Sequence, residues 1–409
     1  MSPARREIYA DHAATTRPAP EVTAAMTPFL GERFGNPSSV HRRGEAAREA
    51  IEAARARVAE LIGASPEEIV LTATGSEANG LALAGTLAAL AQDAVRGGGN
   101  ARRRIVISAI EHPSVLETAR HLEARGAALT IVPVASDGVV DPARVEAALG
   151  PDVALVSVML ANNEIGTLQP VADIARLAHG VGARMHTDAI QAVGKLPVDV
   201  TTFEVDLLSL AGHKFHGPLG AAALYVRRRV RIEPQVHGGH QERSRRAGTE
   251  NLPAIVGLGA AAVRARRTLG SETPRRIAML GERLFAGLRE RVPGASLNGE
   301  GAPRLPGVVN VRFEGVDGEA VLHELDLAGI TVSTGSACSA ATPGPSHVLL
   351  ALGLGPEDAH ASVRFSLGEE TSEADVERMV ATTAEVVERL RALGAPAGAR
   401  ASDVRRASA

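Results

Sequence analysis

The chain has 409 residues, of which 45% are hydrophobic and 22% charged, and its formal net charge is −3. This balance is ordinary for a globular protein and gives no reason to expect a nucleic-acid or membrane partner. Aromatic residues make up 2% of the chain and tryptophan is absent, so we expect a core of leucine, valine, isoleucine and alanine. The length suggests about two domains.

The sequence also bears on location and on redox chemistry. The longest uncharged run, residues 78–92, is shorter than the roughly 20 apolar residues of a membrane span. Residues 1–7 lack the apolar segment of a signal peptide, so a cytoplasmic protein is expected. The single cysteine, Cys338, allows neither an intramolecular disulfide nor a cysteine-rich metal site, and no metal is predicted. A lone cysteine is most often a small buried hydrophobic residue.

The chain opens with an extended segment, a turn and a helix. Residues 8–16 are typical of an extended entry segment. Asn36 lies in the turn predicted at residues 34–39, for which one interpretation is a plain Asn-Pro turn. Residues 42–61 have the charge alternation of an amphipathic helix, which Gly63 ends.

A phosphate site is predicted where the first buried strand ends. Residues 68–72 are typical of a strand, residues 73–79 form a turn of small residues, and a helix is expected from Gly80. The backbone N–H groups of Gly75 and Ser76, the Ser76 hydroxyl and the helix dipole would then point at an anion. The alternative is an ordinary helix cap, because serine and threonine cap helices in many proteins.

The next segments alternate between strands and helices. Strands are predicted at residues 104–110, 128–134 and 153–160, with a helix at 141–149 between the last two. His112 follows the first of these strands and Asn163 the last. The alternation from about residue 66 to 226 predicts an α/β domain with a largely parallel sheet, whose ligands bind at the carboxyl ends of the strands. A histidine at the end of a strand, such as His112, can also be structural, with its ring bonded to a backbone carbonyl.

An aspartate and a lysine follow two later strands. One strand ends at Asp188, and another, residues 205–210, leads through a glycine to Lys214 before a further strand at 221–226. Desolvation and cationic neighbours would depress the pKa of Lys214, as a Schiff-base lysine requires. Asp188 would pair with the protonated pyridine nitrogen of pyridoxal phosphate, which makes the ring an electron sink. The alternative is a lysine on a surface loop.

Together these motifs resemble a known family. His-x-Asp-Ala-x-Gln at residues 186–191, followed by Gly-His-Lys at 212–214, resembles the class V group of fold-type I pyridoxal phosphate enzymes. In particular it is similar to the NifS/IscS-type cysteine desulfurases. The segment at 8–16 and the Glu-His pair at 111–112 resemble further motifs of that group, and the resemblance extends from about residue 8 to about residue 393.

The C-terminal part carries the cysteine and an arginine. After a strand at 308–313 and a helix at 318–327, Cys338 lies among small residues, with proline and glycine after it, which favours a mobile, exposed loop over a core position. Its Ser-x-Gly-Ser-Ala-Cys sequence resembles the NifS/IscS catalytic loop and not the shorter SufS-type loop. Arg364 lies in the apolar strand 361–368, and a buried arginine needs an anion such as a carboxylate. A helix is predicted at 375–393.

The resemblance implies a fold-type I architecture. The large domain, residues 15–260, would hold a mainly parallel sheet of the seven-stranded type. A smaller α+β domain, residues 1–14 and 261–393, would carry the Cys338 loop, and residues 394–409 are expected to form a disordered tail.

The resemblance also implies the site. Pyridoxal phosphate would be held by Gly75, Ser76, His112, Asn163, Asp188, Gln191, His213, Lys214 and, from the neighbouring subunit of a homodimer, Thr249. The substrate L-cysteine would contact Asn36, Asn163 and Arg364. The catalytic residues would be Lys214, Cys338, whose thiolate attacks the substrate sulfur, and His112, which could take the thiol proton.

One position departs from the family pattern, because Ala211 replaces the serine whose hydroxyl commonly bonds the cofactor phosphate. The missing bond is worth roughly 1.5–3 kcal/mol. The resemblance implies a cysteine desulfurase that delivers sulfur to an acceptor protein in iron–sulfur cluster assembly or tRNA thiolation. The alternatives are a selenocysteine lyase, a class V aminotransferase, or, in view of Ala211, a catalytically weak sulfur-relay subunit.

Overall fold

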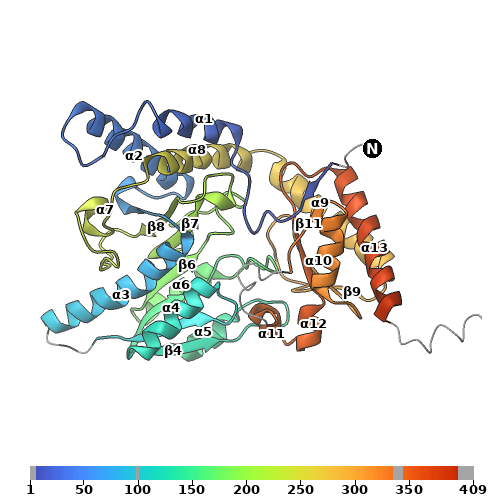
Figure 1. The fold of residues 1–409 in the computed structure, drawn as a ribbon. Coiled ribbons are helices and arrows are strands. Elements are labelled where there is room, and N and C mark those ends of the chain that lie inside the picture. Colours follow the sequence, from blue (N-terminus) through green and yellow to red (C-terminus); the bar gives the residue numbers. More distant parts are fainter. Residues whose placement is uncertain (1–5, 98, 100, 335–343, 395–409) are drawn as a thin grey trace, which may run out of the picture. The chain divides into compact units, whose positions relative to one another are not determined.

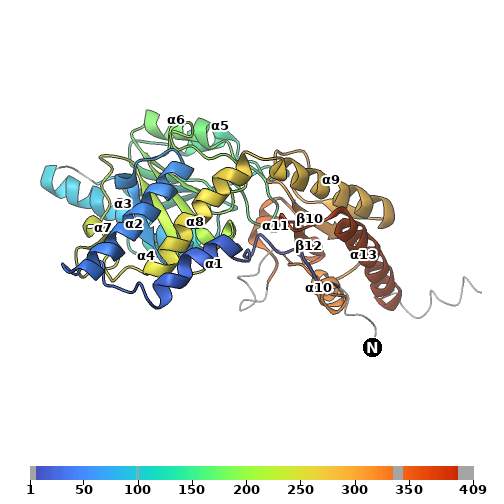
Figure 2. The same ribbon diagram turned by 90° about the horizontal axis from the view of Figure 1, so that it is seen from above.

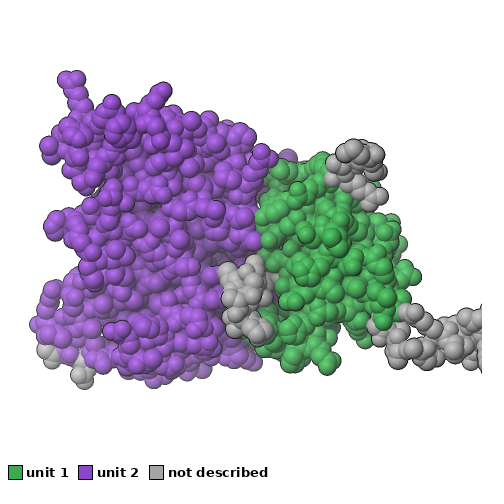
Figure 3. All heavy atoms as spheres, viewed as in Figure 1, with its two compact units in different colours: residues 1–12, 275–300, 306–409 green, residues 13–274, 301–305 purple. Residues whose placement is uncertain are grey.

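The structure is a computed structural model that describes residues 6–97, 99, 101–334 and 344–394. The chain divides into two compact units, which Figure 3 distinguishes by colour. Unit 1 comprises residues 1–12, 275–300 and 306–409, and unit 2 comprises residues 13–274 and 301–305. The predicted domain limit at residue 260 falls inside a helix of unit 2, and the roles assigned to the two domains stay predictions.

Unit 2 contains a seven-stranded sheet in the order β2-β8-β7-β6-β5-β3-β4 (Figure 1). Its strands are β2 (Ile69–Thr72), β3 (Arg104–Ser108), β4 (Ala128–Val132), β5 (Val153–Ser157), β6 (Arg184–Asp188), β7 (Leu207–Ala211) and β8 (Ala222–Val226). Strand β8 is antiparallel to both of its neighbours, and the remaining pairs are parallel. The predicted α/β fold with a mainly parallel sheet is therefore confirmed.

The central strands are apolar because both faces of the sheet are covered. Every residue of β5, β7 and β8 is buried, as expected for strands between two layers of helices. The polar residues inside the sheet bond one another, since His186 Nδ1 lies 2.7 Å from Ser157 Oγ and His186 Nε2 lies 3.1 Å from Ser209 Oγ. Burial lowers the pKa of His186 to about 3, so this ring is neutral and structural.

Eight helices accompany this sheet within the described part of unit 2. They are α1 (Pro20–Met26), α2 (Arg42–Leu61), α3 (Gly75–Gly97), α4 (Pro113–Ala124), α5 (Pro142–Ala148), α6 (Val171–Gly180), α7 (Gln241–Ser244) and α8 (Leu252–Leu269). Short 3-10 turns occur at η1 (Thr27–Leu30), η2 (Pro66–Glu68) and η3 (Gly212–Lys214). Helices α1, α2 and α8 lie side by side (Figures 1 and 2). The predicted helix 42–61 is confirmed.

Unit 1 has a separate, smaller sheet. Strands β12 (Ser362–Ser366), β10 (Val308–Phe313) and β9 (Ala295–Leu297) are antiparallel in that order, and β1 (Ile8–Tyr9) pairs in parallel with β11 (Ile330–Thr331). The helices are α9 (Thr273–Arg291), α10 (Gly318–Leu327), α11 (His347–Ala351), α12 (Pro356–His360) and α13 (Glu373–Gly394).

The core of unit 1 explains why its elements were predictable. Phe313 and Phe365 are fully buried beside aliphatic residues of α9, α10 and α13. The strand predicted at 308–313 and the helix predicted at 318–327 are confirmed at both ends. Asp317 begins that helix because its carboxylate accepts hydrogen bonds from two first-turn N–H groups. In the described part of the chain, no helix combines the length and apolarity needed to cross a membrane.

Candidate active site

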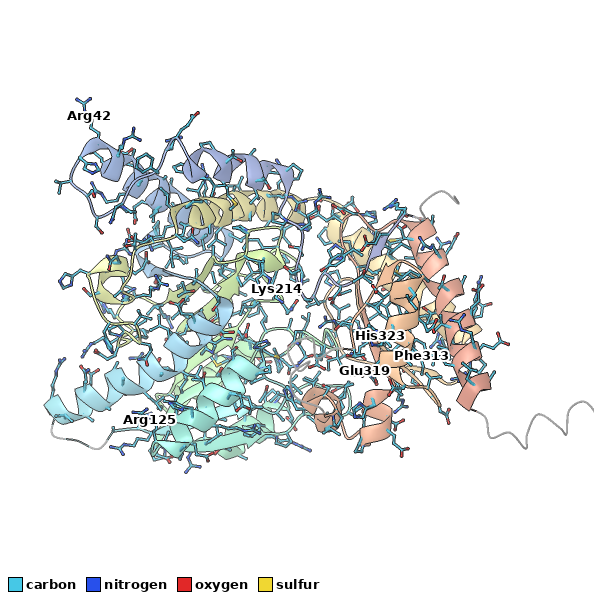
Figure 4. The ribbon with its side chains drawn as sticks, in the orientation of Figure 1. Arg42, Arg125, Lys214, Phe313, Glu319 and His323 are labelled. Carbon is cyan, nitrogen blue, oxygen red and sulfur yellow. The ribbon has the colours of Figure 1, made fainter. Side chains whose placement is uncertain are left out.

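Lys214 lies where strand β7 turns back into β8 (Figure 4). Its Nζ donates hydrogen bonds to the carbonyl oxygens of Ala13, at 2.8 Å, and Ala14, at 2.7 Å. The side chain is half-buried. The extended entry segment of the chain therefore holds the lysine amine in place at the carboxyl end of β7.

His213 precedes the lysine and is kept neutral. Burial first, and then the positive charges of Lys214 and Lys195, lower the pKa of His213 to about 4. The imidazole Nδ1 lies 3.2 Å from Thr15 Oγ1, and the His213 carbonyl accepts hydrogen bonds from the backbone N–H and the hydroxyl of Thr16. At neutral pH the ring therefore adds no charge beside the lysine.

Asp188 ends strand β6, which is the neighbour of β7 in the sheet. Its carboxylate is 3% exposed. Oδ1 accepts a hydrogen bond from the Ile190 N–H at 2.9 Å, and Oδ2 accepts one from Asn79 Nδ2 at 2.7 Å. Both oxygens are thus fixed by N–H donors, so the carboxylate is oriented before any ligand binds.

Gln191 belongs to the same network as the lysine. Its Nε2 donates to the Ala13 carbonyl at 2.8 Å, the oxygen that also accepts from Lys214, and its Oε1 accepts from Lys195 Nζ at 2.7 Å. The structure therefore brings Lys214, His213 and Gln191 together around residues 13–16. A contact between Gln191 and the cofactor stays a prediction.

Helix α3 begins at Gly75, earlier than the predicted start at Gly80. The Thr74 hydroxyl accepts from the Glu77 N–H at 3.0 Å, and the Glu77 carboxylate accepts from the Ala73 N–H at 2.8 Å, so the turn itself is capped as a helix start. A Cβ added at Gly75 would lie 2.3 Å from Ile190 Cδ1 and 3.5 Å from Ala211 Cβ. The helix start and residue 211 are therefore neighbours, as a shared phosphate site requires.

The departure at Ala211 is not repaired by the nearby Ser209. The Ser209 hydroxyl bonds His186 inside the sheet and is completely buried. Ser76, by contrast, is exposed in the first turn of α3. The Ser76 hydroxyl predicted from the sequence is thus exposed at this helix start.

Of the two neighbouring amides at 162 and 163, one is structural. Asn162 is completely buried, donates to the Ile110 carbonyl at 3.0 Å, and accepts from the N–H groups of Glu164 and Ile165. Asn163 is half-buried in the same turn. Asn163 therefore remains the candidate for ligand contact.

Asn36 and Thr249 are both exposed. Asn36 Oδ1 accepts from the Ser38 N–H at 2.9 Å, which is the plain Asn-Pro turn considered above. Thr249 lies five residues after the short α7 segment (Gln241–Ser244), which we call the α7 loop. The predicted contacts of Asn36 with the substrate and of Thr249 with a neighbouring subunit stay predictions.

The buried ion pair between Arg55 and Glu242 holds the α7 loop. Three consecutive residues, Glu242 to Ser244, have positive φ angles of 47°, 57° and 64°, which cost energy for residues other than glycine. The Glu242 carboxylate accepts hydrogen bonds from Arg55 Nη1 at 2.5 Å, Arg55 Nη2 at 2.9 Å and the Leu71 N–H at 2.8 Å. The side chains of the pair are 5% and 1% exposed.

Arg364 lies on strand β12 of unit 1. Its side chain is 2% exposed, and Nη2 donates to Asp11 Oδ1 at 2.7 Å. The backbone of Arg364 exchanges two hydrogen bonds with Ser333. Ser333 is five positions before Cys338 in the sequence. Cys338 itself and residues 395–409 lie outside the described residues.

Glu111 is a buried acid that sequence reasoning did not single out for titration. Burial raises the pKa of its carboxyl to about 8, although hydrogen bonds donated to Oε1 by the Ser108 hydroxyl and the Met159 N–H oppose the shift, and the Asp188 charge adds to it. The ordinary pKa of this group is 4.5. Between these two values the folded protein keeps a proton that the unfolded chain loses.

This difference predicts a pH-dependent effect of Glu111→Gln. Stability contributed by a raised acid pKa is full below pH 4.5 and declines as the pH rises toward 8. Glutamine keeps the accepting oxygen but has no proton to lose. Relative to the original protein, the variant should therefore gain stability with pH, by about 3 kcal/mol near pH 7. Thermal melts from pH 5 to pH 8 measure this gain, with the exposed Glu117→Gln as control; a difference that does not change with pH would contradict it.

Comparisons with known proteins show the family. Residues 8–379 match the family described as Aminotransferase class-V. A curated protein named Cysteine desulfurase IscS, from Dictyoglomus turgidum, is 43% identical over 389 residues, covering 95% of this chain and 96% of that protein. A Cysteine desulfurase from Cereibacter sphaeroides is 46% identical over 394 residues, covering 96% and 98%.

Solved structures are similar as well. A NifS-like protein superposes with a TM-score of 0.85 at 35% identity, covering 94% of this chain and all of the other. A structure described as SspA in complex with cysteine gives a TM-score of 0.77 at 36% identity, covering 89% of this chain and all of the other. The chain therefore belongs to the aminotransferase class-V family and, within it, to the cysteine desulfurases.

Proposed function

We propose that this enzyme converts L-cysteine to L-alanine and takes the sulfur onto Cys338 as a persulfide. The observation that carries the proposal is the placement of Asp188 and Lys214 at the carboxyl ends of the neighbouring strands β6 and β7. The names of the relatives support it and do not favour a selenocysteine lyase, an aminotransferase or a catalytically weak sulfur-relay subunit.

The residues of unit 2 fit pyridoxal phosphate. Asp188 offers a preoriented carboxylate for a protonated pyridine nitrogen, and Lys214 offers an amine held by neutral carbonyl oxygens. Gly75 leaves room at the start of α3, where a side chain would collide with Ile190, and helix N-termini favour phosphate. His112, Asn163, Gln191, His213 and Ser76 complete the proposed set. When bound, pyridoxal phosphate supplies an electron sink for the substrate Cα.

The residues of this chain would then act as follows. Asp188 holds a proton on the ring nitrogen through its carboxylate. The Lys214 amine carries the cofactor and, once released, moves the proton of the substrate Cα. Arg364 binds the substrate carboxylate through its guanidinium, which suits two parallel N–H bonds to a carboxylate. Asp11 accepts a hydrogen bond from Nη2 of that guanidinium.

Cys338 would be the sulfur acceptor. Its thiolate attacks the sulfur of the substrate, a new S–S bond forms and the substrate Cβ–S bond breaks. The electron pair of the broken bond stays with the substrate carbon, which takes up a proton to give alanine, and Cys338 is left as a persulfide. Reduction of that persulfide by two equivalents of an added thiol yields sulfide and a disulfide.

The proposal extends to partners. We infer a homodimer in which Thr249 reaches the neighbouring site, supported by the exposed position of Thr249 after the strained α7 loop. We further infer transfer of sulfur to an iron–sulfur scaffold or a thiolation protein, supported by the relative named IscS.

The experiment is incubation with L-cysteine and excess dithiothreitol, with alanine and sulfide measured in the same samples. Equal amounts of the two products, both lost in Lys214→Ala and in Cys338→Ala, are the expected result. Absence of sulfide in a preparation that holds pyridoxal phosphate would overturn the proposal. Full activity in Cys338→Ala would also overturn it and favour aminotransferase chemistry.

A further inference from the structure

A chain of hydrogen bonds in unit 2 links Asp188 to His112. Asn79 Nδ2 lies 2.7 Å from Asp188 Oδ2 and 2.9 Å from Ser114 Oγ, and Ser114 Oγ lies 2.8 Å from His112 Nδ1. The four residues come from α3, α4, the turn before α4 and β6. Two of them, Asn79 and Ser114, were not among the residues predicted from the sequence.

The direction of each bond follows from the donors available. A carboxylate only accepts, so the Asn79 amide must present its NH₂ group to Asp188. The same NH₂ group has a second hydrogen, which it donates to the Ser114 hydroxyl oxygen. That hydroxyl then keeps its own hydrogen for His112 Nδ1, which also accepts the Ser114 backbone N–H at 3.1 Å. Every bond is therefore donated away from Asn79.

This arrangement sets the protonation of the imidazole. His112 Nδ1 accepts from two donors of Ser114, so it carries no hydrogen and the neutral ring has its hydrogen on Nε2. An imidazole in this form donates from Nε2 and cannot accept a proton there. The predicted role of His112 as acceptor of the substrate thiol proton is therefore disfavoured at Nε2, and a hydrogen-bond donor role is favoured.

Asn79 itself is an unusual residue for its position. It is completely buried in α3 next to Ala78 and Ala82. Among the described residues, its Oδ1 makes no hydrogen bond. Burying an amide whose oxygen has no hydrogen bond lowers the stability of the fold. An alanine at position 79 would avoid that loss of stability. The two bonds donated by its nitrogen give a reason for its presence.

We propose that Asn79 and Ser114 are positioning residues that couple the Asp188 carboxylate to the tautomer of His112. Asn79 holds Oδ2 of Asp188, and Ser114 fixes His112 as the Nε2–H form. The link to catalysis rests on the proposed function, whereas the tautomer is a property of the chain alone. The proposal thus has one readout that needs activity and one that does not.

The first test is nitrogen NMR of the full-length protein labelled with ¹⁵N-histidine, with the His112 signals identified by their loss in His112→Gln. We expect an unprotonated Nδ1 and a protonated Nε2. Ser114→Ala removes the hydroxyl donor and keeps the backbone N–H donor to Nδ1, so the two resonances should move part of the way toward each other, and Ser114→Thr should restore them. A protonated Nδ1 in the original protein, or unchanged signals in Ser114→Ala, would overturn the proposal.

The second test is a double-mutant cycle on alanine formation. Asn79→Ala should lower kcat at least tenfold, and Asn79→Ala/Ser114→Ala should lose no more than Asn79→Ala alone, because both residues act through one chain of bonds. Thr118→Ala is the matched control, since its hydroxyl bonds the Ser114 carbonyl at 2.7 Å outside this chain, and it should stay within twofold. Independent, multiplying losses would overturn the coupling. If the original protein formed no alanine, the proposed function would fail while the NMR result still decided the tautomer.

Discussion

Asp188→Asn is expected to lower kcat for alanine formation by a hundredfold to a thousandfold, the scale seen when one preorganised electrostatic group is removed. The substitution removes the negative charge that would keep a ring proton in place. In the original protein one Asp188 oxygen accepts from the Ile190 N–H and the other from Asn79 Nδ2. The new amide NH₂ would therefore face one of these two donors. Steady-state alanine production per folded molecule measures the effect.

Asp206→Asn is the matched control for this substitution. Asp206 is also 3% exposed and also accepts a backbone N–H, that of Met185 at 2.9 Å, but it bonds His179 rather than Asn79. Its replacement should lower stability and leave kcat per folded molecule within about threefold, a change of less than 1 kcal/mol in barrier height. Equal losses of kcat in the two variants would show that the effect of Asp188→Asn is one of folding and not of catalysis.

Replacing either member of the Arg55–Glu242 pair should destabilise unit 2 by about 3–5 kcal/mol, because the remaining charge loses its buried partner. After loss of Glu242, Arg55 keeps its ion pair with Glu52, at 3.0 Å, whose side chain is 48% exposed. Glu242→Gln is the cleaner substitution, since glutamine keeps an oxygen for the Leu71 N–H. The strained residues after Glu242 would then lose the contact that holds them. Urea denaturation followed by circular dichroism measures the loss.

Two further variants separate the buried charge from other causes. Asp152→Asn removes an ion pair with Arg104 whose side chains are 53% and 38% exposed, and it should cost less than about 1 kcal/mol. Arg55→Met/Glu242→Leu removes both buried charges and should recover part of the loss. If Glu242→Gln were as mild as Asp152→Asn, the pair would not be what holds the α7 loop.

The elements and the strand-end residues were largely predictable because local patterns determine them. The strand at 308–313 and the helix at 318–327 follow from apolar periodicity and an aspartate cap. Lys214 and Asp188 were predictable because parallel strands present their carboxyl ends at one edge. The start of α3 was placed too late, at Gly80, because the small residues before it were interpreted as a turn, whereas Thr74 and Glu77 cap a helix there.

The contacts between distant segments could not be predicted in the same way. Asn79 and Asp188 are 109 positions apart, and no local pattern records their distance. Ser114 has the sequence context of an ordinary first-turn serine. Asn79, a polar residue in an alanine-rich helix, is the signal in the sequence that could have indicated this network. Arg55 resembled the solvated charges of an amphipathic helix, and its burial depends on Glu242, 187 positions away.

The parallel pairing of β1 with β11 has a consequence for synthesis on the ribosome. Ile8 pairs with Ile330, so more than 300 further residues must be translated after the first strand before its partner strand is synthesised. Every residue of unit 2, by contrast, has been translated by position 305. Contacts this distant in sequence form late. A nascent chain paused between these two points would therefore carry a complete unit 2 and an N-terminal strand still without its sheet.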